Sequence, residues 1–227
     1  MGSQIVAEAR YTTTPANIDG RLDDPIWSEC TTYELILPLA PPTNGQVPEN
    51  PARVRFAWDD EYFYLACEFT DHDVVAEGNE DGLHHYRMGD LAELFLKPEA
   101  GHAVWELYLT PRGNQTTFFF PGRGRMGLPE HFESQPILKV AATVNGTLNN
   151  WQDTDSGWIG EMAVPISELR KHGGDFGVGV PWRVFVARYN YSYDLTLISG
   201  PELSSFPQLP IADWHDLDNY AQLKLIR

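Results

Sequence analysis

The chain has 227 residues, of which 42% are hydrophobic and 12% aromatic, so one large core can form without a framework of disulfides. Its 16 basic and 32 acidic residues give a formal net charge of −16. That balance argues against nucleic acids and anionic membranes as partners and favours neutral or cationic ligands, or a divalent metal ion. No run of 18 or more apolar residues occurs, so we expect no membrane insertion.

Short runs of aromatic and β-branched residues, separated by Pro and Gly, predict strands along most of the chain. The predicted strands are residues 53–58, 61–69, 90–97, 104–110, 115–120, 137–144, 157–165, 182–189 and 220–226. Helical patterns are confined to short turns at 23–30 and 167–171. The predicted fold is therefore an all-β, antiparallel β-sandwich of jelly-roll type, in a single domain with long loops at 38–51 and 121–136.

Alternation along two of these strands predicts which side chains share a face. Trp105 falls on one face of its strand and Glu106 on the other, and Glu93 falls opposite Leu94. If the polar faces meet, then Glu93, Glu106 and Arg188 form a charged cluster. Such a cluster either is a structural network of ion pairs or binds the hydroxyl groups of a ligand.

The remaining tryptophans and the two cysteines fit a packed interior. Aliphatic neighbours predict core positions for the tryptophans at 27, 58, 105, 158 and 182. Cys67 lies in an apolar run and is expected to pack as a small apolar side chain. The sequence leaves open whether Cys67 forms a disulfide with Cys30.

Six motifs follow one another in order: IDGRLDDPIW from residue 18, FAWDDEYFY from 56, DHD from 71, GDLAELFL from 89, GWIGEMAVP from 157 and WHDLDNYAQLKL from 214. Together they resemble the family 9 carbohydrate-binding modules and their wider relatives, the DOMON-like β-sandwiches. The resemblance covers about 18–227 as the sandwich and leaves 1–17 as an N-terminal segment with one strand. It implies a secreted or periplasmic protein that binds poly- or oligosaccharides beside a glycoside hydrolase domain and serves polysaccharide degradation.

The resemblance also implies a sugar site without catalytic residues. The family's sugar modules clamp a terminal sugar between two aromatic side chains, and Tyr86 and Trp214 stand at the two corresponding positions, the first of which is Trp in the family pattern. Glu93 matches the Glu of the family's Asp-x-x-Glu strand, and Asp216 lies two residues after Trp214. The polar neighbours of Trp214 predict an exposed loop, so we expect its ring to serve as an open platform.

Other hydrogen-bonding groups depart from the family pattern. Glu106 stands where the best-known branch has Arg, and Arg188 lies on the late strand where that branch uses amide and carboxylate groups. We expect both at the rim of the site with Glu93 and Asp216. Tyr189 and Tyr191, in an expected loop after that strand, are predicted as further contacts.

Calcium is the one cofactor that the family leads us to expect, and no organic cofactor is expected. Asp71 and Asp73 end a strand and are the predicted pair of calcium ligands. The alternative is a solvated acidic loop.

Two other functions are compatible with the sequence. Glu93 and Glu106 suit the paired carboxylates of a glycosidase. A haem-binding electron-transfer domain of the DOMON type would take axial ligands such as His85 and Met88. We expect binding without catalysis, because the family resembled is not known for hydrolysis.

Overall fold

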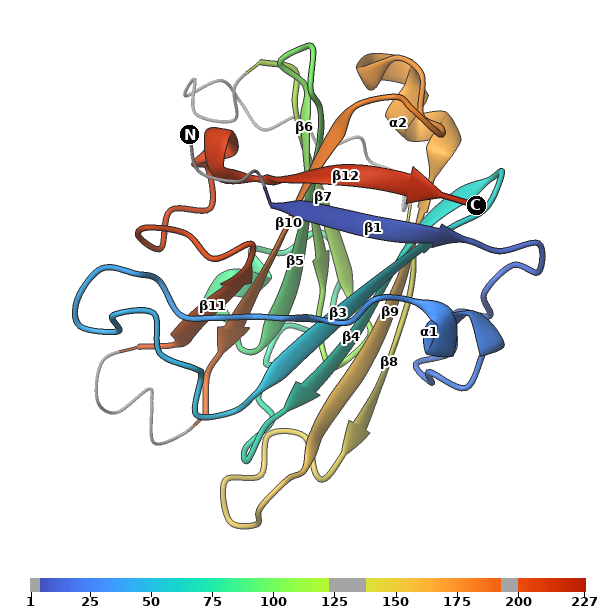
Figure 1. The fold of residues 1–227 in the computed structure, drawn as a ribbon. Coiled ribbons are helices and arrows are strands. Elements are labelled where there is room, and N and C mark those ends of the chain that lie inside the picture. Colours follow the sequence, from blue (N-terminus) through green and yellow to red (C-terminus); the bar gives the residue numbers. More distant parts are fainter. Residues whose placement is uncertain (1–4, 123–137, 193–199) are drawn as a thin grey trace.

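The computed structural model describes residues 5–122, 138–192 and 200–227 (Figure 1). The strands in chain order are β1 (Val6–Tyr11), β2 (Tyr33–Glu34), β3 (Ala52–Trp58), β4 (Tyr62–Thr70), β5 (Leu91–Pro98), β6 (Val104–Leu109), β7 (Gln115–Phe120), β8 (Lys139–Asn145), β9 (Gly157–Pro165), β10 (Trp182–Asn190), β11 (Glu202–Phe206) and β12 (Ala221–Ile226). The helices are α1 (Pro25–Glu29) and α2 (Ile166–Gly173), with short 3-10 turns η1 (His85–Arg87) and η2 (Leu217–Asn219). The described part of the chain contains no helix with the length and apolarity that a membrane crossing requires.

The strands form one bent sheet in the order β7-β6-β5-β10-β12-β1-β3-β4-β9-β8, with β11 beside β10 and β2 beside β3. This confirms the predicted all-β sandwich. One feature differs from the antiparallel prediction, because β1 pairs in parallel with both β12 and β3. In Figure 1, β1 and β12 run side by side across the other strands, so β1 joins the two halves of the sheet.

The main core lies between the layer β10-β5-β6-β7 and the layer β3-β4-β9-β8. Alternate side chains of each strand point into it, since successive residues of a strand face opposite sides. Tryptophans 27, 58, 105, 158 and 182 are all buried, as predicted, and the last four belong to this core or its edge. Cys67 is fully buried there and Cys30 is half-buried; both are free thiols, so the disulfide is not formed.

Both layers also bury their outer faces, each under a long segment of the chain. The segment 16–30, with α1, covers β3, β4 and β9 through a small cluster that contains Trp27 and Tyr64. The segment from Leu209 to Tyr220 covers β5 and β10 through Phe95 and Phe185. Because both of its faces are covered, every residue of β5 is buried.

Candidate functional site

A cavity of about 370 Å³ opens on the outer face of the β10-β5-β6-β7 layer, beside the covering segment after β11. Five of the predicted binding residues line it: Tyr86, Glu93, Glu106, Tyr189 and Trp214. The prediction of binding residues missed His84, Tyr108, Phe118, Phe120, Asp213 and His215, which also line it. Alternation already placed Tyr108 on the face of Glu106, so this residue was within reach of sequence reasoning.

The register between β5 and β6 brings the two glutamates together. Glu93 lies directly opposite Tyr108, and Phe95 lies directly opposite Glu106. Residues opposite each other in an antiparallel pair share a face, so Glu93 and Glu106 are diagonal neighbours on the cavity side. Both side chains are buried.

The two glutamates differ in their partners. The Tyr108 hydroxyl donates a hydrogen bond to Glu106 Oε1, and His215 Nε2 lies 3.5 Å from Glu106 Oε2. Glu93 is only 1% exposed, and its Oε2 has no hydrogen-bond partner among the described residues. A buried carboxylate oxygen without a donor is costly, so Glu93 is the group in the cavity that most needs a ligand.

Burial and mutual repulsion set the protonation of these groups. Burial raises the pKa of Glu93 well above its ordinary value, and the neighbouring charge of Glu106 raises it further. Burial likewise raises the pKa of the Tyr108 and Tyr189 hydroxyls, and the charge of Glu93 adds to both shifts. Both tyrosines therefore remain neutral hydrogen-bonding groups at physiological pH.

Trp214 lines the cavity, but the expectation of an open platform is wrong. Trp214 is only 7% exposed, because its ring packs against two aromatic rings. Its ring centroid lies 5.5 Å from that of Phe185 and, in an edge-on arrangement, 6.2 Å from that of Tyr189. The Tyr220 hydroxyl donates to the Trp214 carbonyl oxygen at 2.5 Å. Long-range packing on β10 outweighs the polar neighbours in the sequence, so Trp214 forms a wall of the cavity.

Tyr86 and the late tyrosines meet at the other side of the cavity. Tyr86 is half-buried, and its ring centroid lies 6.2 Å from that of Tyr189. The rings of Tyr189 and Tyr191 are stacked, with their centroids 6.4 Å apart. Tyr189 belongs to β10 rather than to the expected loop. Tyr191 is not among the lining residues, but its hydroxyl donates to the Tyr86 carbonyl oxygen at 2.6 Å and so holds η1 in place.

Arg188 is not part of the site, so the predicted cluster of Glu93, Glu106 and Arg188 is wrong for this residue. In the register of β10 with β5, Arg188 lies opposite Ala92, whereas Ala187 lies opposite Glu93. Arg188 therefore points into the core side of the sheet. There it pairs with Asp71 at 2.8 Å, and both side chains are fully buried.

Asp216 does not line the cavity either. Its Oδ2 accepts a hydrogen bond from the Asn219 side-chain amide at 2.7 Å within the turn η2. Asp213 lies in the cavity wall instead. The closing motif thus contributes Asp213, Trp214 and His215 to the cavity, while Asp216 shapes the turn that follows.

The predicted calcium ligands are engaged with the protein. Asp71 Oδ2 binds Arg188, and Asp71 Oδ1 accepts a hydrogen bond from the Asp73 amide at 3.1 Å. No group of three or more His, Cys, Asp or Glu side chains suited to a metal occurs within residues 5–122, 138–192 and 200–227. With both oxygens of Asp71 partnered, this pair is poorly suited to calcium, and the expected ion remains a prediction without a site.

His85 and Met88, considered above as haem ligands, do not line the cavity. Both pack against Gly78, where a Cβ atom would come within 2.8 Å of His85 Nδ1 and 3.0 Å of Met88 Sδ. Burial lowers the pKa of His85.

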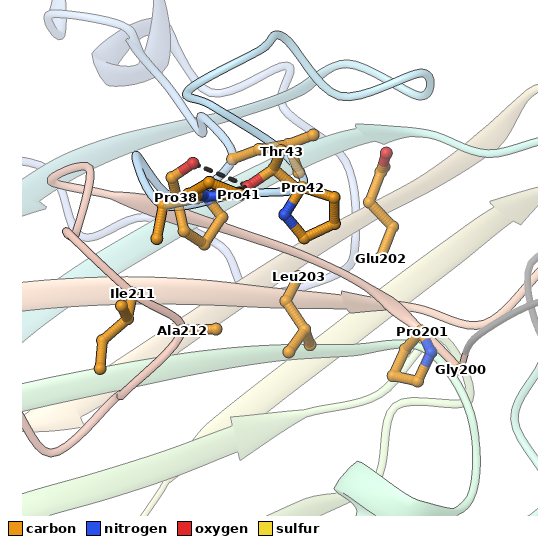
Figure 2. A pocket seen from close by; sticks show the side chains of 12 residues that line it. Pro38, Pro41, Pro42, Thr43, Gly200, Pro201, Glu202, Leu203, Ile211 and Ala212 are labelled. Carbon is orange, nitrogen blue, oxygen red and sulfur yellow. Dashed lines mark hydrogen bonds between the residues drawn. The ribbon is translucent and has the colours of Figure 1, made fainter.

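A second cavity of about 370 Å³ adjoins the first and shares Leu203 and Ala212 with it. Figure 2 shows Pro38, Pro41 and Pro42 on one side of it and Leu203 and Ile211 on the other. Its polar side chains already have protein partners: Thr43 donates to the Pro38 carbonyl oxygen at 2.8 Å, and Glu202 accepts from the Glu49 amide at 3.2 Å. The first cavity, which holds the unpartnered carboxylate oxygen, is therefore the stronger candidate for a binding site.

Comparison with known proteins shows similarity of structure without similarity of sequence. No protein-family model matches the chain, and the search of curated proteins found no match. The structure is similar to that of a protein from Bacteroides uniformis to which carbohydrate binding has been assigned provisionally, with a TM-score of 0.75, 13% identity, and coverage of 99% of this chain and 100% of that one.

Two structures of a family 9 carbohydrate-binding module from Caldicellulosiruptor kristjanssonii are also similar. The complex with cellotriose has a TM-score of 0.63 at 14% identity, covering 96% of this chain and 92% of that one. The complex with glucose has a TM-score of 0.61 at 14% identity, covering 96% and 95%. At these identities the similarity establishes a shared fold, as the resemblance of the motifs implied.

Proposed function

We propose that the chain binds carbohydrate without catalysing a reaction, and that a sugar unit enters the cavity between Tyr86 and Trp214. The observation that carries this proposal is Glu93 Oε2, which is buried in a cavity walled by aromatic rings and has no hydrogen-bond partner in the described part of the chain. A pyranose has apolar C–H faces and a rim of hydroxyl donors. Tyr and Trp rings suit the faces, and carboxylate oxygens suit the hydroxyls.

The similar structures support a sugar as the ligand class, because one module with this fold holds cellotriose and glucose. In this chain Glu93 and Glu106 would accept hydrogen bonds from the hydroxyls of a poly- or oligosaccharide. The catalytic partner domain, the role in polysaccharide degradation and the secreted or periplasmic location remain predictions from the resemblance.

The experiment is a calorimetric titration of the chain with glucose and cello-oligosaccharides, preceded by a glycan array to widen the choice of sugars. Tyr86→Ala should lower the affinity about tenfold, because it removes one aromatic wall. Trp151→Ala is the matched control, since Trp151 is 60% exposed and is not among the residues that line the cavity. Equal losses in both variants, or no binding of any glycan on the array, would contradict the proposal.

The glycosidase alternative rests on the same pair of carboxylates and is tested in the same preparation. Glycosidases hold their two carboxyl groups on either side of the scissile bond, whereas Glu93 and Glu106 are diagonal neighbours on one sheet face. We expect no release of chromophore from a panel of chromogenic glycosides. Turnover that disappears in Glu93→Gln would replace the binding proposal with an enzymatic one.

A further inference from the structure

The ionisable groups of the cavity are mostly acidic. Glu93, Glu106 and Asp213 line it, and its only basic side chains are His84 and His215, since no Lys or Arg lines it among the described residues. A neutral sugar would satisfy hydrogen bonds here but would leave this charge unbalanced. We propose, building on the function proposed above, that the preferred ligand is a sugar with a free amino group whose ammonium binds at Glu93 and Glu106.

Arg188 does not supply a cation to the two glutamates. Arg188 lies on β10 beside the site, but its side chain occupies the opposite face of the sheet and is paired with Asp71. The cation that would balance the two glutamates is therefore not supplied from this strand. His215 contributes one contact at 3.5 Å, and it reaches Glu106 rather than Glu93.

Glu93 and Glu106 differ in how their carboxylate oxygens are contacted. Tyr108 and His215 each contact one oxygen of Glu106, while Glu93 Oε2 is buried in the cavity wall without a donor from any residue that the structure describes. An ammonium group has three N–H donors and a positive charge, so it can bond Glu93 and its diagonal neighbour Glu106 at once. Hydrogen bonds between charged groups are about twice as strong as neutral ones.

Binding of a cation at this site is coupled to the protonation of Glu93. Burial and the charge of Glu106 both raise the pKa of Glu93, so the empty cavity retains a proton that a bound cation would displace. The other ionisable groups that face or interact with the pair are His84, Tyr86, Tyr108, Tyr189, Tyr191, Asp213, His215 and Tyr220. The preference for an amino sugar should therefore increase as pH rises and the pair ionises, for as long as the amine keeps its own proton.

The experiment compares three oligosaccharides of equal length by calorimetry: β-1,4-linked glucosamine, N-acetylglucosamine and glucose. We expect the glucosamine oligomer to bind about tenfold more tightly than the glucose oligomer at pH 6.5, with the acetylated oligomer close to glucose. Titrations in buffers of different ionisation enthalpy should show proton release for the amino sugar alone.

Variants separate the site from the general negative charge of the protein. Glu93→Gln should bring the ratio of the two affinities to near one. Glu34→Gln removes one charge from an exposed side chain outside the cavity and should leave the ratio unchanged. Circular dichroism of each variant establishes that it is folded.

The outcomes are distinct. Binding of glucose oligomers with a ratio near one in the unmodified chain would overturn this inference and leave the proposed function standing. Absence of binding to all three oligomers would overturn this inference, and absence of binding to any glycan on the array would overturn the proposed function as well. A ratio that persists in both Glu93→Gln and Glu106→Gln would assign the preference to overall charge and would also overturn the inference.

Discussion

The two outer faces of the sandwich each bury a glutamate, and they surround it in opposite ways. On the face of β4 and β9, Glu161 Oε2 accepts hydrogen bonds from the amides of Asp19, Gly20 and Arg21 at 2.8–3.2 Å, and Oε1 accepts one from Trp27 Nε1 at 2.8 Å. On the face of β5 and β6, Glu93 Oε2 has no partner in the described structure. One carboxylate receives its donors from the chain, and the other has an oxygen to which no described residue donates.

The covering segments explain this difference. Gly20 has φ of +80°, and a Cβ atom there would lie 2.7 Å from the backbone of Ala142, so glycine lets the backbone amides approach Glu161. The segment that covers β5 instead presents side chains, among them Trp214 and Asp213, and within the described residues no backbone amide donates to Glu93 Oε2. A buried carboxylate thus indicates a binding site only when the surrounding chain fails to supply its donors.

The largest loss of stability should come from truncating Trp214, in the segment that covers β5. Trp214→Ala removes a nearly buried ring from the cluster of Phe95, Phe185 and Tyr220, so we expect a loss of about 3–5 kcal/mol in the free energy of unfolding. Urea denaturation measures it, and the exposed Trp151→Ala should change stability by less than about 0.5 kcal/mol. Equal stability of the two variants would mean that Trp214 is an open platform after all.

The second-largest loss of stability should come from substitution of Glu161, the glutamate whose oxygens both accept hydrogen bonds from the chain. Glu161→Ala leaves Trp27 Nε1 and the amides around Gly20 without an acceptor, which should cost about 2–4 kcal/mol of unfolding free energy. Glu161→Gln keeps an acceptor oxygen and should cost less. Glycan affinity should not change in either variant, because Glu161 lies on the opposite face; a loss of affinity equal to that of Glu93→Gln would remove the distinction between the two faces.

Substitution of Glu93 should change the free energy of unfolding in the opposite direction and stabilise the fold. Glu93→Gln removes a buried carboxyl group whose ionisation burial opposes and whose Oε2 has no partner among the described residues, so we expect a gain of about 1–2 kcal/mol in the free energy of unfolding at neutral pH. Because the folded pKa of Glu93 is raised, the folded state retains a proton that the unfolded chain releases. The unmodified chain should therefore lose stability as pH rises from the unfolded pKa towards the raised folded pKa, with a slope of up to about 1.4 kcal/mol per pH unit.

Denaturation curves of the unmodified chain and Glu93→Gln between pH 4 and 8 measure this difference. The gap between them should widen with rising pH. A destabilised Glu93→Gln, or a gap that narrows as pH rises, would show that Glu93 has a structural donor as Glu161 does.

The face that carries Glu161 holds several of the motifs on which the family resemblance rests, and the core position predicted for Trp27 is confirmed there. The Asp-Gly near residue 19, Trp27 and Glu161 belong to the motifs on which the family resemblance rests, and the structure shows them bonded to one another. Asp59 similarly accepts hydrogen bonds from the amides of Glu61 and Tyr62 in the turn between β3 and β4. The shared motifs therefore specify the fold more than they specify a ligand.

The face that carries Glu93 depends on strand register and long-range packing that the sequence motifs do not show. Placing Arg188 required the register between β10 and β5, and a shift of one residue moves a side chain to the other face. The burial of Trp214 depends on Phe185 and Tyr220 rather than on its polar neighbours. The parallel position of β1 between β12 and β3 likewise joins the two ends of the chain to its middle.

The smallest change in stability should come from Tyr191, whose hydroxyl holds the turn that carries Tyr86. Tyr191→Phe removes the hydroxyl that donates to the Tyr86 carbonyl oxygen, a partly buried bond between neutral groups, and should cost about 0.5–1 kcal/mol of unfolding free energy. Glycan affinity should fall by a few-fold, because Tyr86 is then less firmly held against the sugar.

Tyr11→Phe is the control, since its hydroxyl donates to Asp60 at 3.1 Å far from the cavity and its loss should leave affinity unchanged. Calorimetry on both variants separates a supporting role from mere proximity: if Tyr191→Phe binds as tightly as the unmodified chain, then η1 is held by its other contacts and Tyr191 is not part of the site.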